Sequence, residues 1–252
     1  MIDQPSTPPE DAGSSPLTAA LPTTVPDVVA RLAAIQTWVE ANSEGGKHDG
    51  VACFNFLYHE ITCRVLEWIN AGKFQDGKFL TTLDLVFANR YLAALKADAA
   101  DPKSAPSAWE ALLEHRNERR IAPLQFAVAG VNAHVNFDLP CTVVAACEQL
   151  GTKPNSGTQR ADYDKVNDIF ALEMTKLRHH FENRFERILD DAVLSHIENV
   201  LGNFSVVAAR DVAWAQAEVL FDRRLHNEDE HGFVDSLDRT VGMAGRLLLV
   251  HL

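Results

Sequence analysis

Residues 131–140 of the chain read VNAHVNFDLP, and the conformation of this stretch decides the fold. Apolar and polar residues alternate strictly in it, which is typical of a half-buried β-strand. A strand would place Asn132, His134, Asn136 and Asp138 together on one face. The stretches on either side have helical patterns, however, so a lone strand would find no partner for its backbone N–H and C=O groups. A helix satisfies its own backbone, and the sequence therefore predicts a helix here.

A helix through this stretch has no broad polar face. His134 and Asp138 lie on one face, four residues apart, whereas Asn132 and Asn136 lie on a face roughly opposite. The residues around them are apolar, which is typical of a helix buried at the centre of a protein. Pro140 has no backbone N–H, so we expect a kink and an unpaired carbonyl beside His134 and Asp138.

Helical patterns continue over most of the chain, and no other segment has a convincing strand pattern. The sequence therefore predicts an all-α protein, with a single large bundle-like domain of about eight helices around the buried central helix. The predicted helices cover about residues 26–42, 50–71, 79–97, 107–117, 121–150, 161–202 (one long helix or two joined ones), 205–225 and 233–252. Within this domain, residues 25–252, the loop at 151–160 is a possible sub-division. The proline-rich residues 1–24 are expected to be a disordered leader.

The composition narrows the range of functions. The 252 residues carry a formal net charge of −12, and the isoelectric point is near 5.2. Nucleic acids and anionic lipid surfaces attract clustered Lys and Arg, so neither is an expected partner. No apolar run approaches the roughly 18 residues of a membrane span, and the first residues do not resemble a signal peptide. We therefore expect a cytoplasmic protein without a membrane span, and the pattern leaves its oligomeric state open.

Several polar residues on the other predicted helices fall on faces that should be buried. They are Asn55 and His59 in the second helix, Asp84, Arg90 and Tyr91 in the third, and Arg210 in the penultimate one. Buried charges need partners or a wet cavity. One interpretation is a structural network, with Asp138 paired to Arg210 and Asp84 paired to Arg90. The interpretation that we favour for the whole group is an interior polar pocket centred on residues 130–140.

Two strings carry a resemblance to a known family. They are AGVNAHVNFDLP at residues 129–140 and TLDLVFANRYLAAL at residues 82–95, and they resemble an uncharacterised actinobacterial helical family of unknown function. The resemblance covers nearly the whole chain after the leader, and it implies an all-helical fold without an assigned activity. It also implies a shared polar core at Asp84, Arg90, Asn132, His134, Asn136 and Asp138.

His134 and Asp138 are also similar to the H-x-x-x-D helix motif of zinc-dependent phospholipase C and the related single-strand nucleases, in which both residues bind zinc. The amino-terminal Trp ligand of those enzymes is absent here. The resemblance therefore implies at most a reduced ligand set for a divalent metal such as zinc, formed by His59, His134 and Asp138. Signatures of serine hydrolases and of nucleotide-binding folds are absent, so no nucleotide cofactor is expected.

The leading functional hypothesis is a hydrolase or acid/base enzyme that acts on a small or amphiphilic, lipid-like substrate. His134, oriented by Asp138, would be the general base or a metal ligand, and Arg210 or Arg90 would hold an anionic group. The residues expected to contact the substrate are Asn55, Asp84, Arg90, Tyr91, Asn132 and Asn136, with aromatic residues such as Phe54, Tyr58 or Tyr91 in the pocket wall. The competing hypothesis is a non-catalytic small-molecule-binding or structural module whose polar core only fixes helix packing.

Overall fold

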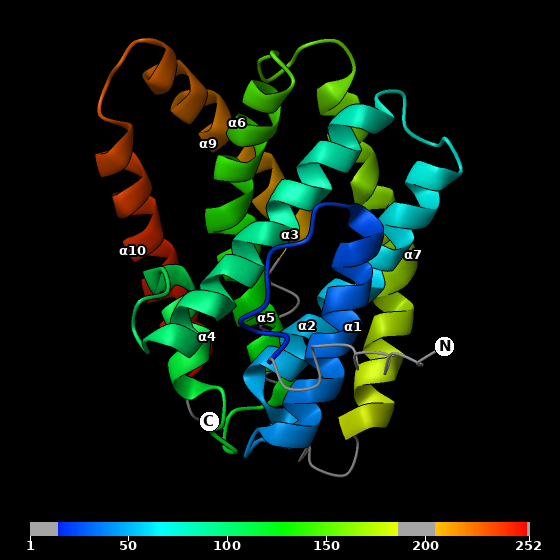
Figure 1. Cartoon of the computed structure of the whole chain (residues 1–252), viewed down its shortest axis with the longest axis vertical. Coiled ribbons are helices and arrows are strands. Elements are labelled where there is room, and N and C mark those ends of the chain that lie inside the picture. Colours follow the sequence, from blue (N-terminus) through cyan, green and yellow to red (C-terminus); the bar gives the residue numbers. More distant parts are fainter. Residues whose placement is uncertain (1–14, 186–204, 251–252) are drawn as a thin grey trace, which may run out of the picture.

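Residues 123–149 form the buried centre of the molecule (Figure 1). In the computed structural model they comprise helix α5 (Pro123–Ala133), the π-helical segment η2 (His134–Asp138) and helix α6 (Leu139–Gln149). The structure describes residues 15–185 and 205–250, and the side chains of residues 15–173 and 205–250. Almost every residue from 121 to 147 is buried, because neighbouring helices cover the segment on several sides. The prediction of a buried central helix is therefore confirmed.

The helical path widens immediately before Pro140. The N–H of Leu139 donates to the carbonyl of His134, five residues back, which is the bonding pattern of a π-helix. Pro140 itself lies in the first turn of α6, where its missing N–H matters least. The Thr142 hydroxyl donates to the carbonyl of Asp138 at 2.8 Å. The irregularity lies where the sequence predicts it, and its form is a π-helical turn rather than a kink within an α-helix.

The other helices come from both halves of the chain and pack on the central segment or on one another. They are α1 (Val25–Asn42), the short 3-10 helix η1 (Gly46–His48), α2 (Gly50–Asn70), α3 (Gly77–Ala100), α4 (Ser107–His115), α7 (Gln159–Phe185), α9 (Val206–Leu225) and α10 (Glu230–Leu248). Helix α2 packs on α5, helices α3 and α9 pack on α6, and α10 packs on α4 and α5. No strand occurs among residues 15–185 and 205–250, so the predicted all-helical fold is confirmed.

The loop at residues 150–158 joins α6 to α7 at the place where the sequence leaves a sub-division possible. Buried residues on both sides of this loop, such as Val144, Tyr163 and Trp214, belong to one continuous hydrophobic core. The described helices therefore form a single domain. The part of the predicted long helix beyond Phe185 lies outside the described residues. In the described ranges, no helix has the length and hydropathy needed to cross a membrane.

The segment before α1 differs from the expected disordered leader. Residues 1–14 lie outside the described part of the chain, but residues 15–24 lie against the domain. Leu17 is buried in the hydrophobic core, and the Arg31 guanidinium donates to the carbonyl of Ala20 at 3.0 Å. A proline-rich composition does not reveal that distant side chains bind carbonyl groups of this segment.

Close packing between α5 and α2 makes glycine necessary at position 130. A Cβ atom there would lie 2.4 Å from the ring of Phe54. We expect Gly130→Ala to lower the free energy of unfolding by about 1–3 kcal/mol, because the ring has to move, although alanine favours helix more than glycine does. Urea unfolding followed by circular dichroism measures the change. Gly77→Ala is the matched control, since a Cβ at that position meets nothing within 4 Å, and equal losses in both variants would contradict the prediction.

Candidate functional site

The carboxylate of Asp138 is fully buried and accepts hydrogen bonds from three side chains. His134 Nδ1 lies 3.0 Å from Oδ2, and the indole Nε1 of Trp109 donates to the same oxygen at 2.9 Å. Arg90 Nε donates to Oδ1 at 3.1 Å. A carboxylate that accepts from Nδ1 fixes the tautomer of a neutral imidazole, so the other ring nitrogen of His134, Nε2, becomes a hydrogen-bond acceptor.

Aromatic side chains hold the His134 ring in place. The Phe87 ring is stacked on it with the centroids 3.5 Å apart. The Tyr58 ring meets it edge to face at 4.6 Å, and the Phe54 ring does so at 5.8 Å. Because the imidazole is both bonded to Asp138 and enclosed by these rings, it has little freedom to turn.

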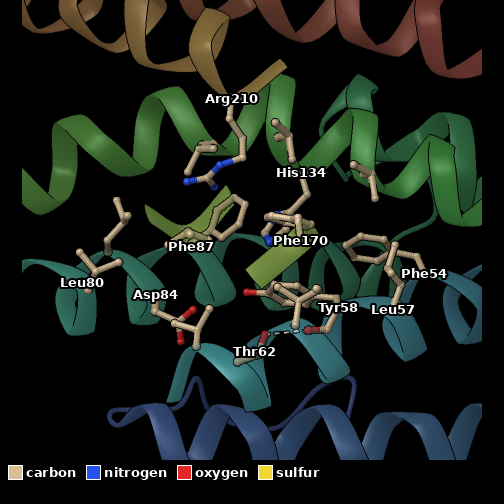
Figure 2. Close-up of a pocket in the computed structure, with 17 residues that line it drawn as sticks. Phe54, Leu57, Tyr58, Thr62, Leu80, Asp84, Phe87, His134, Phe170 and Arg210 are labelled. Atoms are coloured by element: carbon tan, nitrogen blue, oxygen red, sulfur yellow. Dashed lines mark hydrogen bonds between the residues drawn. The ribbon is translucent and has the colours of Figure 1, made fainter. Parts of the chain in front are cut away.

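A cavity of about 60 Å³ lies beside the His134 ring, with walls from α2, α3, the central segment, α7 and α9. Figure 2 shows Arg210 entering from the α9 side and Asp84 and Tyr58 on the opposite side, with His134 between them. Three buried polar atoms in this wall have no hydrogen-bond partner among the described residues, namely His134 Nε2, Asp84 Oδ2 and the Tyr58 hydroxyl oxygen. The rest of the wall comprises Phe54, Leu57, Ile61, Thr62, Val65, Leu80, Leu83, Phe87, Val131, Val135, Leu139, Val166 and Phe170. The predicted pocket beside the 130–140 helix is thus present, with Phe54 and Tyr58 among its aromatic residues.

Burial shifts the pKa values of the three unpartnered groups. It lowers the pKa of His134, against the opposing effect of the Asp138 carboxylate. It raises the pKa of Asp84 to about 7, and it raises the pKa of Tyr58 well above its ordinary value, with a further contribution from Asp84. Near neutral pH the cavity wall therefore holds a neutral imidazole, a partly protonated carboxyl group and a protonated phenol.

Arg210 is buried as the sequence predicts, but its partners are neutral. Nε donates to Asn167 Oδ1 at 2.8 Å, and Nη2 donates to the backbone carbonyl of Tyr163 at 2.6 Å. The guanidinium carbon also lies 4.1 Å from the centre of the Tyr163 ring. Arg210 therefore reaches the cavity from a position fixed by α7.

The two ion pairs considered from the sequence are both wrong. Asp138 pairs with Arg90 instead of Arg210, and Asp84 Oδ2 has no partner in residues 15–173 and 205–250, whose side chains are described. Arg90 lies in the wall of a separate, wider groove of about 420 Å³ on the other side of Asp138, together with Asn89. Helical periodicity shows which face of its own helix a residue occupies. Which residue of an opposing helix becomes its ion-pair partner depends on how the helices pack.

Besides Arg90, four more of the residues expected to contact substrate are not part of the cavity wall. The Asn55 amide donates to a carbonyl of α1 at 2.9 Å, and the Tyr91 hydroxyl lies 3.5 Å from Asn55 Oδ1. The Asn132 amide donates to a carbonyl of α10 at 3.0 Å, and the Asn136 amide donates to Asn132 Oδ1. Asn55 and Asn132 therefore join neighbouring helices. The central segment is buried on both faces, and only the face of His134 meets the cavity.

The expected metal ligands do not come together. His59 is partly exposed on α2, where its Nε2 lies 3.5 Å from Cys63 Sγ and its Nδ1 lies 3.7 Å from Glu60. Within residues 15–185 and 205–250, no three His, Cys, Asp or Glu side chains are grouped so that they could hold a metal ion. The predicted set of His59, His134 and Asp138 therefore does not form a zinc site here.

Sequence reasoning missed three side chains that shape the site. Trp109 supplies a donor to Asp138, Asn167 fixes the Arg210 guanidinium, and Phe87 covers the His134 ring. Phe87 has a usable signal, because it follows Asp84 by one turn on the buried face of α3. Trp109 and Asn167 have none, because each meets a partner from a distant part of the chain.

The buried Asp84 carboxyl makes stability depend on pH. Because its pKa rises from 3.8 to about 7, the folded state holds an extra proton between these values, and the free energy of unfolding falls as pH rises through them. We expect Asp84→Asn, which cannot ionise, to be more stable than the wild type by on the order of 4 kcal/mol at about pH 8, with a much smaller difference at about pH 4. His134 acts with the opposite sign, since its lowered pKa removes stability below about pH 6.5, but it does so in both proteins. Urea unfolding across this range gives the comparison, and parallel profiles would contradict the assigned protonation of Asp84.

Comparison with known proteins identifies a family and no function. No curated protein and no solved structure gives a significant match to this chain. A family model described as DUF5995, a family of unknown function, matches residues 25–251. The match covers nearly all of the chain, and the protein therefore belongs to the DUF5995 family.

Proposed function

We propose that the protein is an enzyme that uses His134 as a general base on a small, largely apolar substrate, with hydrolysis of an ester or amide as the reaction. One observation carries the proposal. Within the described part of the chain, His134 Nε2 is buried in the cavity wall without a hydrogen-bond partner, while Asp138 holds the other nitrogen of the ring. General-base catalysis by histidine needs an oriented ring with one free acceptor nitrogen beside the place where substrate lies.

The other unpartnered groups fit the remaining tasks of a hydrolysis. Water gives a proton to His134 Nε2 as its oxygen attacks the carbonyl carbon, and Asp138 stabilises the imidazolium that forms. The Tyr58 hydroxyl donates to the carbonyl oxygen as negative charge develops there. Protonated Asp84 gives its proton to the leaving oxygen or nitrogen as the bond to the carbonyl carbon breaks. Transfer of the proton from His134 back to Asp84 through solvent completes the cycle.

The wall composition favours water as the nucleophile. Among the residues of the described cavity wall there is no Ser or Cys, and the Thr62 hydroxyl donates its hydrogen to the backbone carbonyl of Tyr58 at 2.8 Å. The cavity volume of about 60 Å³ exceeds the roughly 10–15 Å³ that one water molecule needs. A single-step attack by water is therefore simpler here than a covalent intermediate.

A non-catalytic binding module is the second candidate. The wall is mainly apolar, as small-molecule sites usually are, and the hydrogen bonds of Asp138 to Arg90 and Trp109 also tie three elements together. Under this alternative the polar core fixes helix packing and the cavity only holds a ligand. The two candidates differ in whether removal of His134 Nε2 abolishes a reaction.

We expect the purified protein to hydrolyse small neutral esters such as methyl formate and methyl acetate. His134→Gln should lower kcat/KM by about 10²–10⁴-fold, because the general base is lost. His59→Gln is the matched control, since it replaces a histidine outside the cavity wall and should leave the rate unchanged. Acid release at constant pH measures hydrolysis, and circular dichroism verifies folding. Equal rates in the wild type and His134→Gln would exclude His134 as the base.

The rate of hydrolysis should depend on pH in a bell-shaped manner. His134 must be neutral, and burial lowers its pKa, so the rate rises with pH below the ordinary histidine value of about 6.5. Asp84 must be protonated, so the rate falls as pH rises above about 7. The pH dependence of kcat/KM measures both limbs. In Asp84→Asn the decrease at high pH should disappear, and its persistence would contradict the role of Asp84 as the acid.

A further inference from the structure

We infer that the cavity binds a small carboxylate, whose negative charge pairs with the buried guanidinium of Arg210. The inference deepens the proposed function and rests on it only in naming this carboxylate as the class of substrate or product. The binding site itself depends on Arg210 and its surroundings.

Arg210 is a buried cation that is held by neutral groups in the part of the chain that the structure describes. Its side chain is oriented by Asn167 Oδ1 and by the Tyr163 carbonyl, which together use two of the five N–H groups of a guanidinium. The residue is 4% exposed and forms part of the cavity wall. Arginine stays charged in proteins, and a buried charge without a counter-ion is strongly unfavourable.

The two carboxylates that act electrostatically on Arg210, Asp164 and Asp211, are already paired with another arginine. Arg160 Nε binds Asp164 at 2.8 Å, and Arg160 Nη2 binds Asp211 at 2.5 Å. Both carboxylates raise the pKa of Arg210 only through longer-range electrostatic attraction. In the described part of the chain, no carboxylate therefore pairs directly with Arg210.

Asp84, the acid in the opposite wall, does not supply the missing charge. Its Oδ2 has no partner among the side chains that the structure describes, and its pKa is raised by burial with no lowering effect from Arg210. The two groups thus lie in one cavity wall without neutralising each other. An anion placed between them would pair with Arg210 and accept a hydrogen bond from protonated Asp84.

The wall and the volume define the class of anion. Outside the polar groups the wall is built from aliphatic and aromatic side chains, so the ligand is apolar apart from its charge. A cavity of about 60 Å³ is less than half of the roughly 150 Å³ that accommodates benzene. Short-chain carboxylates of the size of propionate fit this limit, and guanidinium groups match the carboxylate geometry.

Calorimetric titration of the wild-type protein with sodium propionate and with propionamide tests the inference. The two probes have nearly the same shape and differ in charge. At fixed ionic strength we expect propionate to bind at least about tenfold more tightly than propionamide, because a charge-assisted hydrogen bond replaces a neutral one. Equal affinities, or no binding of propionate, would overturn the inference.

Variants of Arg210 locate the site. Arg210→Met should abolish the preference for propionate, and Arg210→Lys, which keeps the charge without the planar fork, should retain part of it. Arg246→Met, which removes an arginine from the α4–α10 contact, is the matched control and should bind as the wild type does. Unchanged propionate binding in both Arg210 variants would overturn the inference. If Arg210→Met does not fold, the comparison of Arg210→Lys with the wild type provides the test.

The same proteins separate this inference from the proposed function. Hydrolysis of methyl acetate, a neutral ester, depends on His134 and does not require a carboxylate at Arg210. Hydrolysis by a wild type that fails to bind propionate would overturn only the carboxylate site. Propionate binding that depends on Arg210, in a protein without hydrolytic activity, would support the site and contradict the enzyme.

Discussion

The burial of one carboxylate constrains the arrangement of the whole domain. Asp138 has almost no exposed surface, so its charge is tolerated only because three donors surround it. Those donors come from three elements, since His134 shares the π-helical segment while Arg90 belongs to α3 and Trp109 belongs to α4. Removing any of these helices from its position would leave a buried charge with fewer partners. The position of the helices around the central segment and the orientation of the imidazole therefore depend on the same carboxylate.

The π-helical turn explains how this carboxylate and its histidine fit inside a packed core. A continuous α-helix with Pro140 in its interior would leave an unmatched carbonyl next to Asp138. The wider turn instead pairs the His134 carbonyl with the N–H of Leu139, and the Thr142 hydroxyl bonds to the Asp138 carbonyl. The backbone irregularity is thereby satisfied locally. The side chains of Asp138 and His134 therefore remain free, one to bond to α3 and α4 and the other to line the cavity.

The sequence predicts much of this arrangement, and the reasons for its failures are physical. Spacing along one helix is enough to pair His134 with Asp138 and to place an irregularity beside Pro140. It is also enough to turn Arg210 inward. It does not identify Arg90 as the partner of Asp138, because that choice depends on how far α3 is rotated and shifted against the central segment. Spacing also cannot show whether the Asn132 face or the His134 face meets the cavity. Both faces are buried, and only the tertiary packing leaves a cavity beside one of them.

The contrast between the two polar regions argues for a function at the cavity. Around Asp138 every donor has an acceptor, as expected of a group that folding itself must stabilise. In the cavity wall the opposite holds within the described residues, since His134 Nε2 and Asp84 Oδ2 lack partners and Arg210 has no counter-ion. Selection for stability alone would favour an apolar side chain or a completed pair at each of these positions, because each unmatched group lowers the free energy of unfolding. A bound molecule that satisfies them together accounts for their presence more simply than three separate imperfections in an otherwise closely packed core.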